Sequence, residues 1–177
     1  MSKLYGLGEV DAQFKVYIAN QPNFQQFSNL TTVQALGRGE IHAIGQACGN
    51  GWRKVFNVYS KLLFALCDTQ LTHVSQCQSW QMYRDQVLLQ VGSNTALLFS
   101  DPILDASPTT KTKQDIHVVM GKTYANSLQL ASSLHWLDKE FAIDQQNKLV
   151  VCPYFDYRQL SNIKIMRLVE LIKCLKA

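Results

Sequence analysis

The stretch "IHVVMGKTYANSL", residues 116–128, decides the fold class that we predict for this chain. Its first part is a short apolar run, which predicts a buried strand over residues 116–121. A glycine closes this run, and apolar side chains then recur at helical spacing, which predicts a helix over residues 122–137. A buried strand that passes directly into a helix is typical of α/β proteins.

The same strand-to-helix pattern occurs earlier and later in the chain. A β-rich run over residues 14–20 precedes a helix over residues 51–67, whose apolar residues recur three and four positions apart. Another apolar run, over residues 148–154, precedes the last helix, over residues 162–176. Strands that alternate with helices at this spacing predict right-handed crossovers. We therefore expect a three-layer α/β/α sandwich with a mainly parallel central sheet.

The remaining segments are less regular. Short helical turns are predicted over residues 31–36 and 40–47, and a further helical piece over residues 79–86. Two apolar runs around "GSN" predict a β-hairpin over residues 87–100, and one continuous strand followed by a loop is the alternative. Residues 101–115 are polar and hold two prolines, which predicts a long surface loop.

The composition indicates a single globular domain over residues 1–177. Hydrophobic residues make up 47% of the chain and charged residues 17%, without the charge excess of a disordered protein. No apolar run reaches the roughly 18 residues that a membrane-spanning helix needs. The amino terminus also lacks the apolar segment of a secretory signal, so we expect a cytoplasmic protein that makes no contact with a membrane.

The cysteines and histidines do not predict a metal site. The five cysteines are odd in number and none stands in a C-x-x-C pair, which disfavours both a disulfide framework and a zinc ribbon. The four histidines are scattered, without a pair at metal-ligand spacing. We therefore expect reduced thiols, no metal and no cofactor. The net charge of +4 permits contact with nucleic acid but does not require it.

The common catalytic and phosphate-binding motifs are not matched. The glycines of "GQACGNGW", residues 45–52, fit neither the phosphate loop nor the dinucleotide fingerprint. The run "MGKT", residues 120–123, ends like a phosphate loop but lacks the upstream glycine, and the chain holds no G-x-S-x-G elbow. Cys152 follows two valines and precedes a proline, which favours a small buried residue over a Cys–His nucleophile with His117 or His135.

Three segments rich in polar and aromatic residues follow the predicted strands. They are "NQPNF" at 20–24, "GKT" at 121–123 and "VVCPYFDYRQLSN" at 150–162. Parallel sheets bind ligands outside the carboxyl ends of their strands, so we expect the three segments to meet in one site. The last segment places tyrosines beside an arginine, a combination that suits stacking on a base or clamping a phosphate.

The order of these segments resembles the uracil-DNA glycosylase superfamily. Four pieces between residues 14 and 175 carry the resemblance. "KVYIANQPNF" (15–24) is similar to the first strand with its water-activating loop, and "VLLQV" (87–91) is similar to the strand that ends in a base-reading asparagine. "IHVVMGKTYANSL" (116–128) is similar to the apolar strand with its glycine and small-residue helix, and "LVVCPYFDYRQLSN" (149–162) is similar to the last strand with its His-Pro loop. The resemblance implies a glycosylase-like fold and a pocket that holds a flipped base.

The chain departs from the superfamily at its catalytic positions. Gln21 stands at the position of the catalytic aspartate or asparagine, and glutamine cannot act as a general base, although its amide could position a water. Gln90 stands at the base-reading position with a side chain one methylene longer than asparagine. Cys152 replaces a histidine, and a thiol is a weak donor. Because one lost donor costs roughly 100- to 1000-fold in rate, a conventional uracil glycosylase is not expected.

We therefore expect a glycosylase-like protein that binds a nucleobase, nucleotide or nucleic acid, with catalysis and oligomeric state left open. The candidate ligand-binding residues are Gln21, Asn23, Phe24, Gln90, Lys122, Tyr154, Asp156, Tyr157 and Arg158. Phe24 stands near the position of the stacking aromatic residue in the superfamily.

Other interpretations of these residues stay open. One is a divergent enzyme for a small phosphorylated or nucleoside substrate, which uses residues 121–123 and Asp156. Another is a non-catalytic protein-interaction module that presents the aromatic residues of the 154–157 segment. The aromatic segment also has a purely structural interpretation, in which Phe155 and Tyr157 cover the sheet edge while Asp156 and Arg158 pair in solvent.

Overall fold

The computed structural model describes residues 3–104 and 115–177. Its helices are α1 (Glu40–Cys48), α2 (Asn50–Leu66), α3 (Trp80–Gln86), α4 (Lys122–Ser127) and α5 (Asn162–Lys176). Its strands are β1 (Gly6–Gly8), β2 (Phe14–Tyr17), β3 (Val33–Gln34), β4 (Thr95–Leu98), β5 (Ile116–Met120), β6 (His135–Trp136), β7 (Ala142–Asp144) and β8 (Leu149–Cys152). Two short 3-10 helices cover Gln25–Asn29 and Val74–Gln76.

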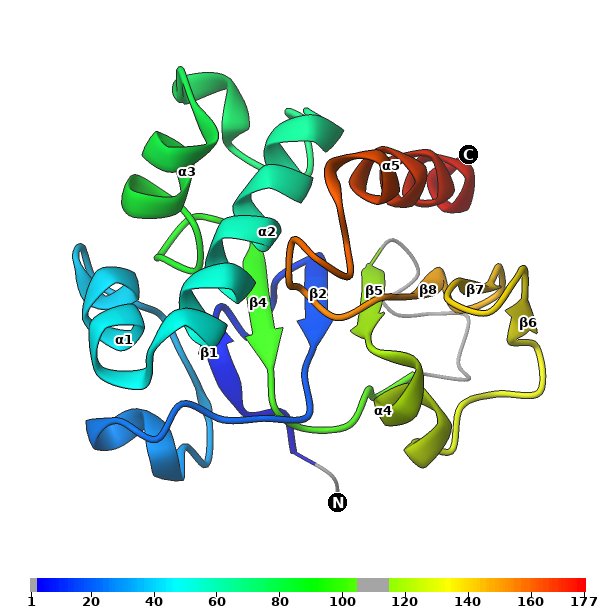
Figure 1. Ribbon diagram of the computed structural model, residues 1–177, viewed down its shortest axis with the longest axis horizontal. Helices are drawn as coiled ribbons and strands as arrows, with labels where there is room; N and C mark the ends of the chain where they lie inside the picture. The colour runs from blue at the N-terminus through cyan, green and yellow to red at the C-terminus, as the bar shows by residue number, and fades with distance from the viewer. Residues whose placement is uncertain (1–2, 105–114) are drawn as a thin grey trace.

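Within the described part of the chain, the eight strands form one mixed sheet in the order β3-β1-β4-β2-β5-β8-β7-β6 (Figure 1). The four central strands β4, β2, β5 and β8 are parallel. The flanking strands pair antiparallel: β1 with β4, β7 with β8, and β6 with β7. The predicted α/β class with a mostly parallel sheet is therefore confirmed, and its parallel centre is the part that can build a strand-end site.

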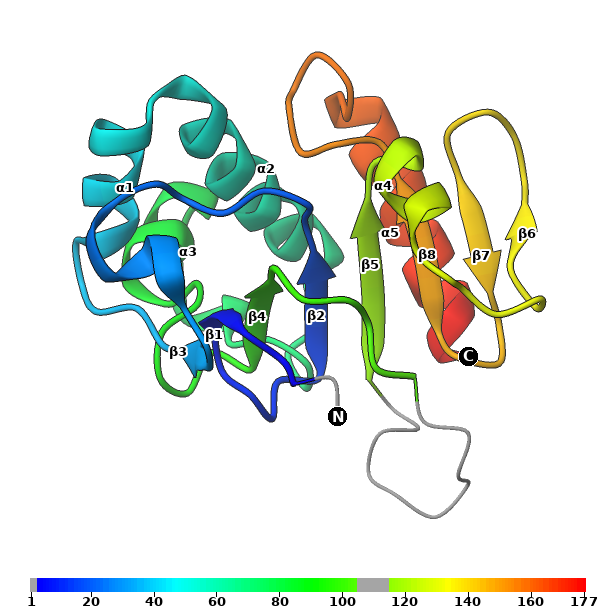
Figure 2. The same cartoon turned by 90° about the horizontal axis from the view of Figure 1, so that it is seen from below.

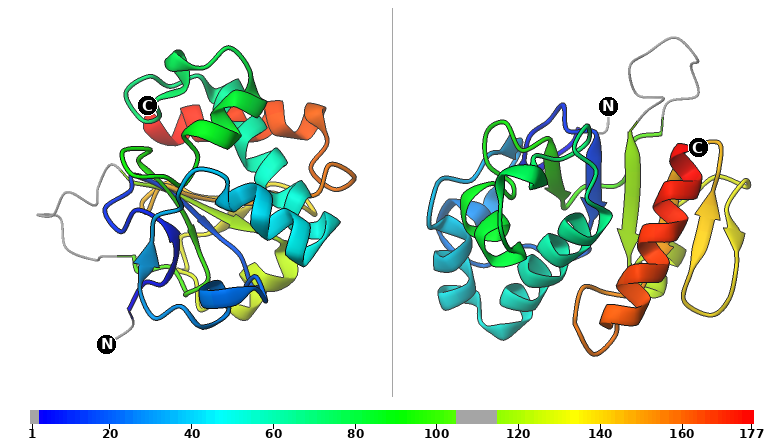
Figure 3. Two further views of the ribbon diagram at one scale, coloured as in Figure 1. Left: turned by 90° about the vertical axis from the view of Figure 1, so that its left-hand side faces the viewer. Right: turned by 90° about the horizontal axis from the view of Figure 1, so that it is seen from above.

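The two faces of the sheet are covered unequally. Helices α2 and α5 lie on one face, with α1 and α3 outside α2 (Figures 1 and 3). Their apolar residues enclose the larger core together with Phe14, Val16, Val118 and Val150 of the central strands. The other face carries the short helix α4, the connecting segments and a smaller apolar cluster. The layers are thus compatible with a three-layer sandwich, although one short helix supplies the third layer.

Most predicted elements agree with the structure to within a few residues. The agreeing predictions are the strands at 14–20, 116–121 and 148–154 and the helices at 40–47, 51–67, 79–86 and 162–176. Helix α2 shows why such predictions agree with the structure, since its buried residues recur every three or four positions over its whole length. Ser79 is the N-cap of α3, because its hydroxyl accepts from the Met82 N–H at 3.1 Å.

Three predicted elements are wrong. Residues 31–36 are not helical but contain the edge strand β3. The hairpin at 87–100 does not form, nor does the single strand followed by a loop, because residues 87–94 are turns and only β4 is a strand. The helix at 122–137 ends at Ser127, whose hydroxyl donates to the Tyr124 carbonyl, and its predicted last residues pair with β7 as strand β6. Most of the loop predicted at 101–115 lies outside the described residues.

The turns at 87–94 are held by distant residues. The Glu9 carboxylate accepts from the Asn94 N–H at 2.7 Å and from the Gly92 N–H at 3.0 Å. Leu89 takes a positive φ of 60° and is fully buried, so the apolar residues of this run fill the core from a turn. In residues 3–104 and 115–177, no helix has the length and apolar character needed to cross a membrane.

Candidate functional site

A pocket of about 600 Å³ opens at the carboxyl ends of β2, β5 and β8. Figure 2 shows β2 and β5 ending on the same side of the molecule, next to α4. The residues that line the pocket are Ala19, Asn20, Met120, Gly121, Lys122, Thr123, Tyr124, Ser127, Lys139, Glu140, Pro153, Tyr154 and Gln159. The pocket therefore lies where the parallel strand order predicts a site, and all three predicted segments contribute to it.

Gly121 is the residue that allows α4 to start directly at the end of β5. Its φ is +98°, a value that residues with a side chain rarely adopt. Its N–H donates to the Cys152 carbonyl at 2.8 Å, which fixes the end of β5 against the end of β8. The sharp change of direction brings Lys122, Thr123 and Tyr124 to the pocket wall.

Two lysines give the pocket positive charge. The Lys122 ammonium lies 5.0 Å from the centre of the Trp136 ring, a cation–π distance. Neither Lys122 nor Lys139 forms an ion pair with another residue that the structure describes. The Glu140 carboxylate, also in the lining, pairs with Lys164 of α5 at 2.8 Å. Both lysine ammonium groups can therefore bind an anion without breaking an ion pair with a described residue.

Two tyrosines and two amides supply the polar, uncharged part of the lining. Burial raises the pKa of Tyr154, and a hydrogen bond from the Asn20 side chain opposes this shift. Burial, together with Asp101, raises the pKa of Tyr124 to about 12. The Tyr124 hydroxyl is buried and has no partner among the described residues. Both phenols are therefore neutral at pH 7, and with Asn20 and Gln159 they can donate and accept hydrogen bonds.

The segment after Tyr154 is held by an ion cluster beside the pocket. The Asp156 carboxylate lies 3.2 Å from the Lys54 ammonium of α2 and 3.4 Å from the Arg158 guanidinium. The N–H of Arg158 donates to the same carboxylate, and these contacts lower the pKa of Asp156 to about 2. The Lys54 ammonium also lies 4.9 Å from the centre of the Tyr157 ring. This cluster, Lys54–Asp156–Tyr157–Arg158, ties the segment to α2 rather than to the pocket.

The structural interpretation of this segment is correct in part. Phe155 is fully buried and meets the Tyr59 ring edge-on at 5.9 Å, so it belongs to the core. Asp156 and Arg158 pair, as that interpretation requires. Tyr157, in contrast, is 57% exposed and covers little of the sheet edge.

Only two of the nine predicted residues line the pocket, namely Lys122 and Tyr154. Gln21 and Asn23 are exposed on the loop after β2, where their neighbour Asn20 reaches the pocket instead. Phe24 is half-buried and stacks against Phe27 at 6.3 Å. Asp156, Tyr157 and Arg158 lie in the adjacent ion cluster.

Gln90 does not lie at the strand carboxyl ends, so the structure does not bring it together with Tyr154. It precedes β4 and therefore lies at the opposite end of the parallel strands. Its side-chain amide donates to the Asp85 carbonyl at 3.0 Å. The physical reason is that the apolar run around Gln90 forms turns, and the strand that follows it ends only at Leu98.

Cys152 has the buried role that its neighbours predict. It is fully buried within β8, and burial raises the pKa of its thiol far above 7. A thiol in this state is not a nucleophile at neutral pH. Among the described residues, no three His, Cys, Asp or Glu side chains gather in a way that could hold a metal ion.

Several residues of the pocket are not among the nine candidate residues. They are Asn20, Thr123, Tyr124, Lys139, Glu140 and Gln159. Asn20, Thr123 and Gln159 lie within the three segments that the strand-end argument places at the site, although they are not among the nine named candidates. Lys139 and Glu140 lie in the turn between β6 and β7, and no local pattern links that turn to the carboxyl ends of β2 and β5.

Comparison with other proteins gives a family but no function. No curated protein matches the chain, and no solved structure matches it. A family model described as a family of unknown function, DUF6942, matches residues 5–173, and the chain therefore belongs to this family.

Proposed function

We propose that the pocket at the strand carboxyl ends binds a nucleotide unit, either free or within a nucleic acid. The observation that carries the proposal is the combination of side chains in one lining: amides, phenols and two lysines without an ion-pair partner among the described residues. The pocket volume of about 600 Å³ falls within the range of roughly 300–1000 Å³ that small-molecule sites occupy.

Each part of a nucleotide has a matching group in the lining. The amides of Asn20 and Gln159 can each donate and accept, which suits the edge of a base. The Tyr154 ring offers an aromatic surface of the kind on which bases stack. Lys122 and Lys139 supply the positive charge that a phosphate requires.

The charge around the pocket favours an anionic ligand. Six cations lie in the pocket or in the ion pairs that border it, against three carboxylates. The cations are Lys54, Lys122, Lys139, Arg158, Lys164 and Arg167, and the carboxylates are Asp138, Glu140 and Asp156. A local positive field raises the association rate of phosphate-bearing ligands.

The resemblance to the uracil-DNA glycosylase superfamily places a ligand at the same edge, but the residues at its catalytic positions do not support catalysis. Gln21 lies outside the pocket lining and Gln90 at the far end of the sheet. Cys152 is enclosed in the core. We therefore propose ligand binding rather than the hydrolysis of a glycosidic bond as the role of this pocket.

The test is a titration with a nucleoside monophosphate and with labelled single- and double-stranded oligonucleotides at low and moderate salt. We expect binding that weakens as the salt concentration rises, because phosphate contacts dominate it. Lys122→Ala should weaken binding about 10-fold, the effect of losing one charge-assisted hydrogen bond.

Lys173→Ala is the matched control, because Lys173 is an exposed lysine in the last turn of α5. This variant should bind as the parent protein does. The proposal fails if no ligand binds at low salt, or if Lys122→Ala and Lys173→Ala change the affinity equally.

A further inference from the structure

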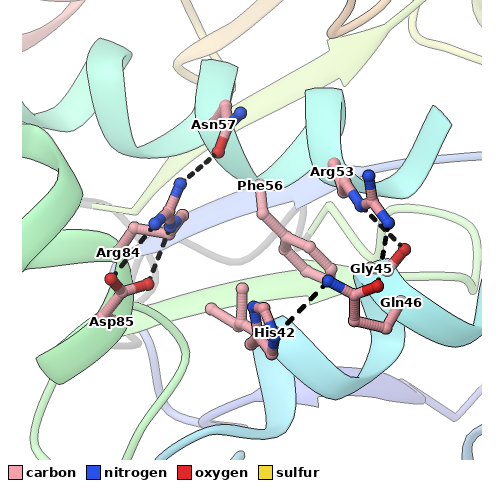
Figure 4. Close-up of a pocket in the computed structure, with 9 residues that line it drawn as sticks. His42, Gly45, Gln46, Arg53, Phe56, Asn57, Arg84 and Asp85 are labelled. Atoms are coloured by element: carbon pink, nitrogen blue, oxygen red, sulfur yellow. Dashed lines mark hydrogen bonds and ion pairs between the residues drawn. The ribbon is translucent and has the colours of Figure 1, made fainter. Parts of the chain in front are cut away.

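A second pocket, of about 190 Å³, lies between α1, α2 and α3, apart from the strand carboxyl ends (Figure 4). Its lining includes the buried apolar residues Ile41 and Phe56. Figure 4 shows the guanidinium groups of Arg53 and Arg84 on either side of the Phe56 ring. The pocket thus combines an apolar wall with two cationic side chains that come from different helices.

The Arg53 guanidinium is fixed by neutral groups only. Its Nε donates to the Gly45 carbonyl, and its two terminal nitrogens donate to the side-chain oxygens of Asn50 and Gln46, each at 3.1 Å. Arg53 has no carboxylate partner in residues 3–104 and 115–177. Gly45 makes this placement possible, since a Cβ there would lie 2.8 Å from the Arg53 Cγ. The positive charge of Arg53 is therefore held in place but not neutralised by an ion pair with a described residue.

The Arg84 guanidinium is also fixed. It donates to the Asn57 side-chain oxygen at 2.7 Å and, through two nitrogens, to the Asp85 carboxylate at 2.8 and 3.1 Å. It lies 5.5 Å from the centre of the Trp80 ring, and the Lys61 ammonium lies 5.0 Å from the same ring. The pocket lining therefore carries two positive charges, on Arg53 and Arg84, and the carboxylate of Asp85, while Lys61 adds a positive charge beside the Trp80 ring.

Both guanidinium groups have more N–H donors than their hydrogen bonds within the protein use. A guanidinium has five N–H donors. Arg53 and Arg84 each use three of them in the contacts above, which leaves two on each side chain. Because the internal bonds already hold the side chains, an anion that accepts from the remaining donors does not have to immobilise them.

We propose that this pocket binds a phosphate group, either as inorganic phosphate or as the phosphate of a small ester. Two guanidinium groups match the several oxygens of a phosphate better than a single cation does. The Phe56 ring between them gives the organic part of an ester an apolar surface. The proposal does not depend on the function proposed for the strand-end pocket, because the two linings share no residue.

The test follows the Nε–Hε signals of Arg53 and Arg84 by NMR during titration of the whole protein. The ligands are sodium phosphate, phenyl phosphate and sodium chloride at matched ionic strength. We expect saturable shifts of both signals with the two phosphates and none with chloride. Tighter binding of phenyl phosphate would identify an ester as the ligand, whereas equal affinities would identify the phosphate itself.

Substitutions distinguish a specific phosphate site from a general electrostatic attraction of anions to the protein. Arg53→Gln should weaken phosphate binding about 10-fold or more, because a charge and its hydrogen bonds are lost. Arg53→Lys keeps the charge without the fork and should bind with intermediate affinity, so it remains informative if Arg53→Gln unfolds. Lys122→Ala, in the other pocket, should leave the shifts unchanged. Phosphate shifts no larger than those with chloride, or an Arg84 signal that titrates with unchanged affinity in Arg53→Gln, would overturn the proposal.

Discussion

Lys15 and Asp115 form a buried ion pair on the sheet, with the ammonium 2.5 Å from the carboxylate. Lys15 is 6% exposed and Asp115 8%. Two further polar side chains adjoin them on β2 and β5, where the Tyr17 hydroxyl lies 2.7 Å from the His117 Nδ1. Buried charges cost desolvation free energy that their attraction only partly offsets, so this pair matters most when one partner is removed.

We expect Asp115→Asn to lower the free energy of unfolding by about 3 to 5 kcal/mol, because it leaves the Lys15 ammonium buried without its counter-charge. Replacing both residues, as Lys15→Met with Asp115→Leu, should restore most of this loss. Urea denaturation measures both effects. Asp85→Asn is the control on an exposed aspartate, and it should change stability by less than about 1 kcal/mol. A loss in Asp115→Asn no larger than that of the control would contradict the expectation.

The strand β1 depends on two glycines that pack against the backbone of β4. A Cβ on Gly8 would lie 2.2 Å from the Thr95 carbonyl oxygen, and a Cβ on Gly6 would lie 2.3 Å from the Leu97 carbonyl oxygen. Both glycines also have a positive φ, +104° at Gly8 and +154° at Gly6. A side chain at either position would therefore push β1 away from the sheet.

Gly8→Ala should lower the free energy of unfolding by about 2 kcal/mol or more, because strain in φ adds to the clash with the backbone. Gly51→Ala is the matched control, since Gly51 lies in α2 and a Cβ there meets nothing within 4 Å. That variant should raise stability by roughly 0.5 kcal/mol through its higher helix propensity. Thermal melts of the two variants should therefore move in opposite directions, and a loss of stability in both would contradict the role of β1.

The elements that sequence reasoning predicts are those that local patterns determine. Helices α2 and α5 show apolar residues at helical spacing over 17 and 15 residues, and β5 and β8 are short apolar runs beside a glycine or a proline. The turns at 87–94 were not predictable, because the Glu9 carboxylate that holds two of their N–H groups lies more than 80 residues away.

The residues of the candidate site also fall into two groups, those that local patterns predict and those that only tertiary contacts bring to the pocket. Lys122 and Tyr154 follow directly from the strand ends, and both line the pocket. Lys139 reaches the pocket only because β6 and β7 fold back antiparallel beside β8. Gln90 lies outside the pocket because the apolar run around it forms core-filling turns rather than the strand that its composition predicts. Local composition thus locates a strand end, whereas tertiary contacts decide which side chains surround it.

At the scale of the whole molecule, three buried ionisable groups and one exposed carboxylate limit the pH range of stability from both sides. Burial and the neighbouring Lys15 lower the pKa of His117 to about 3. Hydrogen bonds to backbone N–H groups, together with Arg167, lower the pKa of Asp138 to about 2. Burial raises the pKa of Tyr17 and of Tyr59 well above 10. All four groups are therefore held in the charge state that they have between about pH 7 and pH 9.

The direction of each effect follows from proton binding. Below its ordinary pKa of about 6.5, His117 binds a proton in the unfolded chain but not in the folded one, so stability falls as the pH falls. Asp138 adds to this loss below about pH 4, because its carboxylate binds a proton in the unfolded chain while it stays ionised in the folded one. Above about pH 10 the tyrosines ionise in the unfolded chain first, so stability falls as the pH rises.

The free energy of unfolding should therefore be nearly constant from about pH 7 to pH 8, above which the Cys152 thiol ionises first in the unfolded chain. It should decline below pH 6.5 by up to 1.4 kcal/mol per pH unit, the value for one proton. His117→Gln should remove most of the slope between about pH 6.5 and pH 4, because glutamine does not titrate but can still bond the Tyr17 hydroxyl. Urea denaturation at several pH values measures the slope, and the exposed-site variant His42→Gln should retain it. An unchanged slope in His117→Gln would show that another group drives acid unfolding.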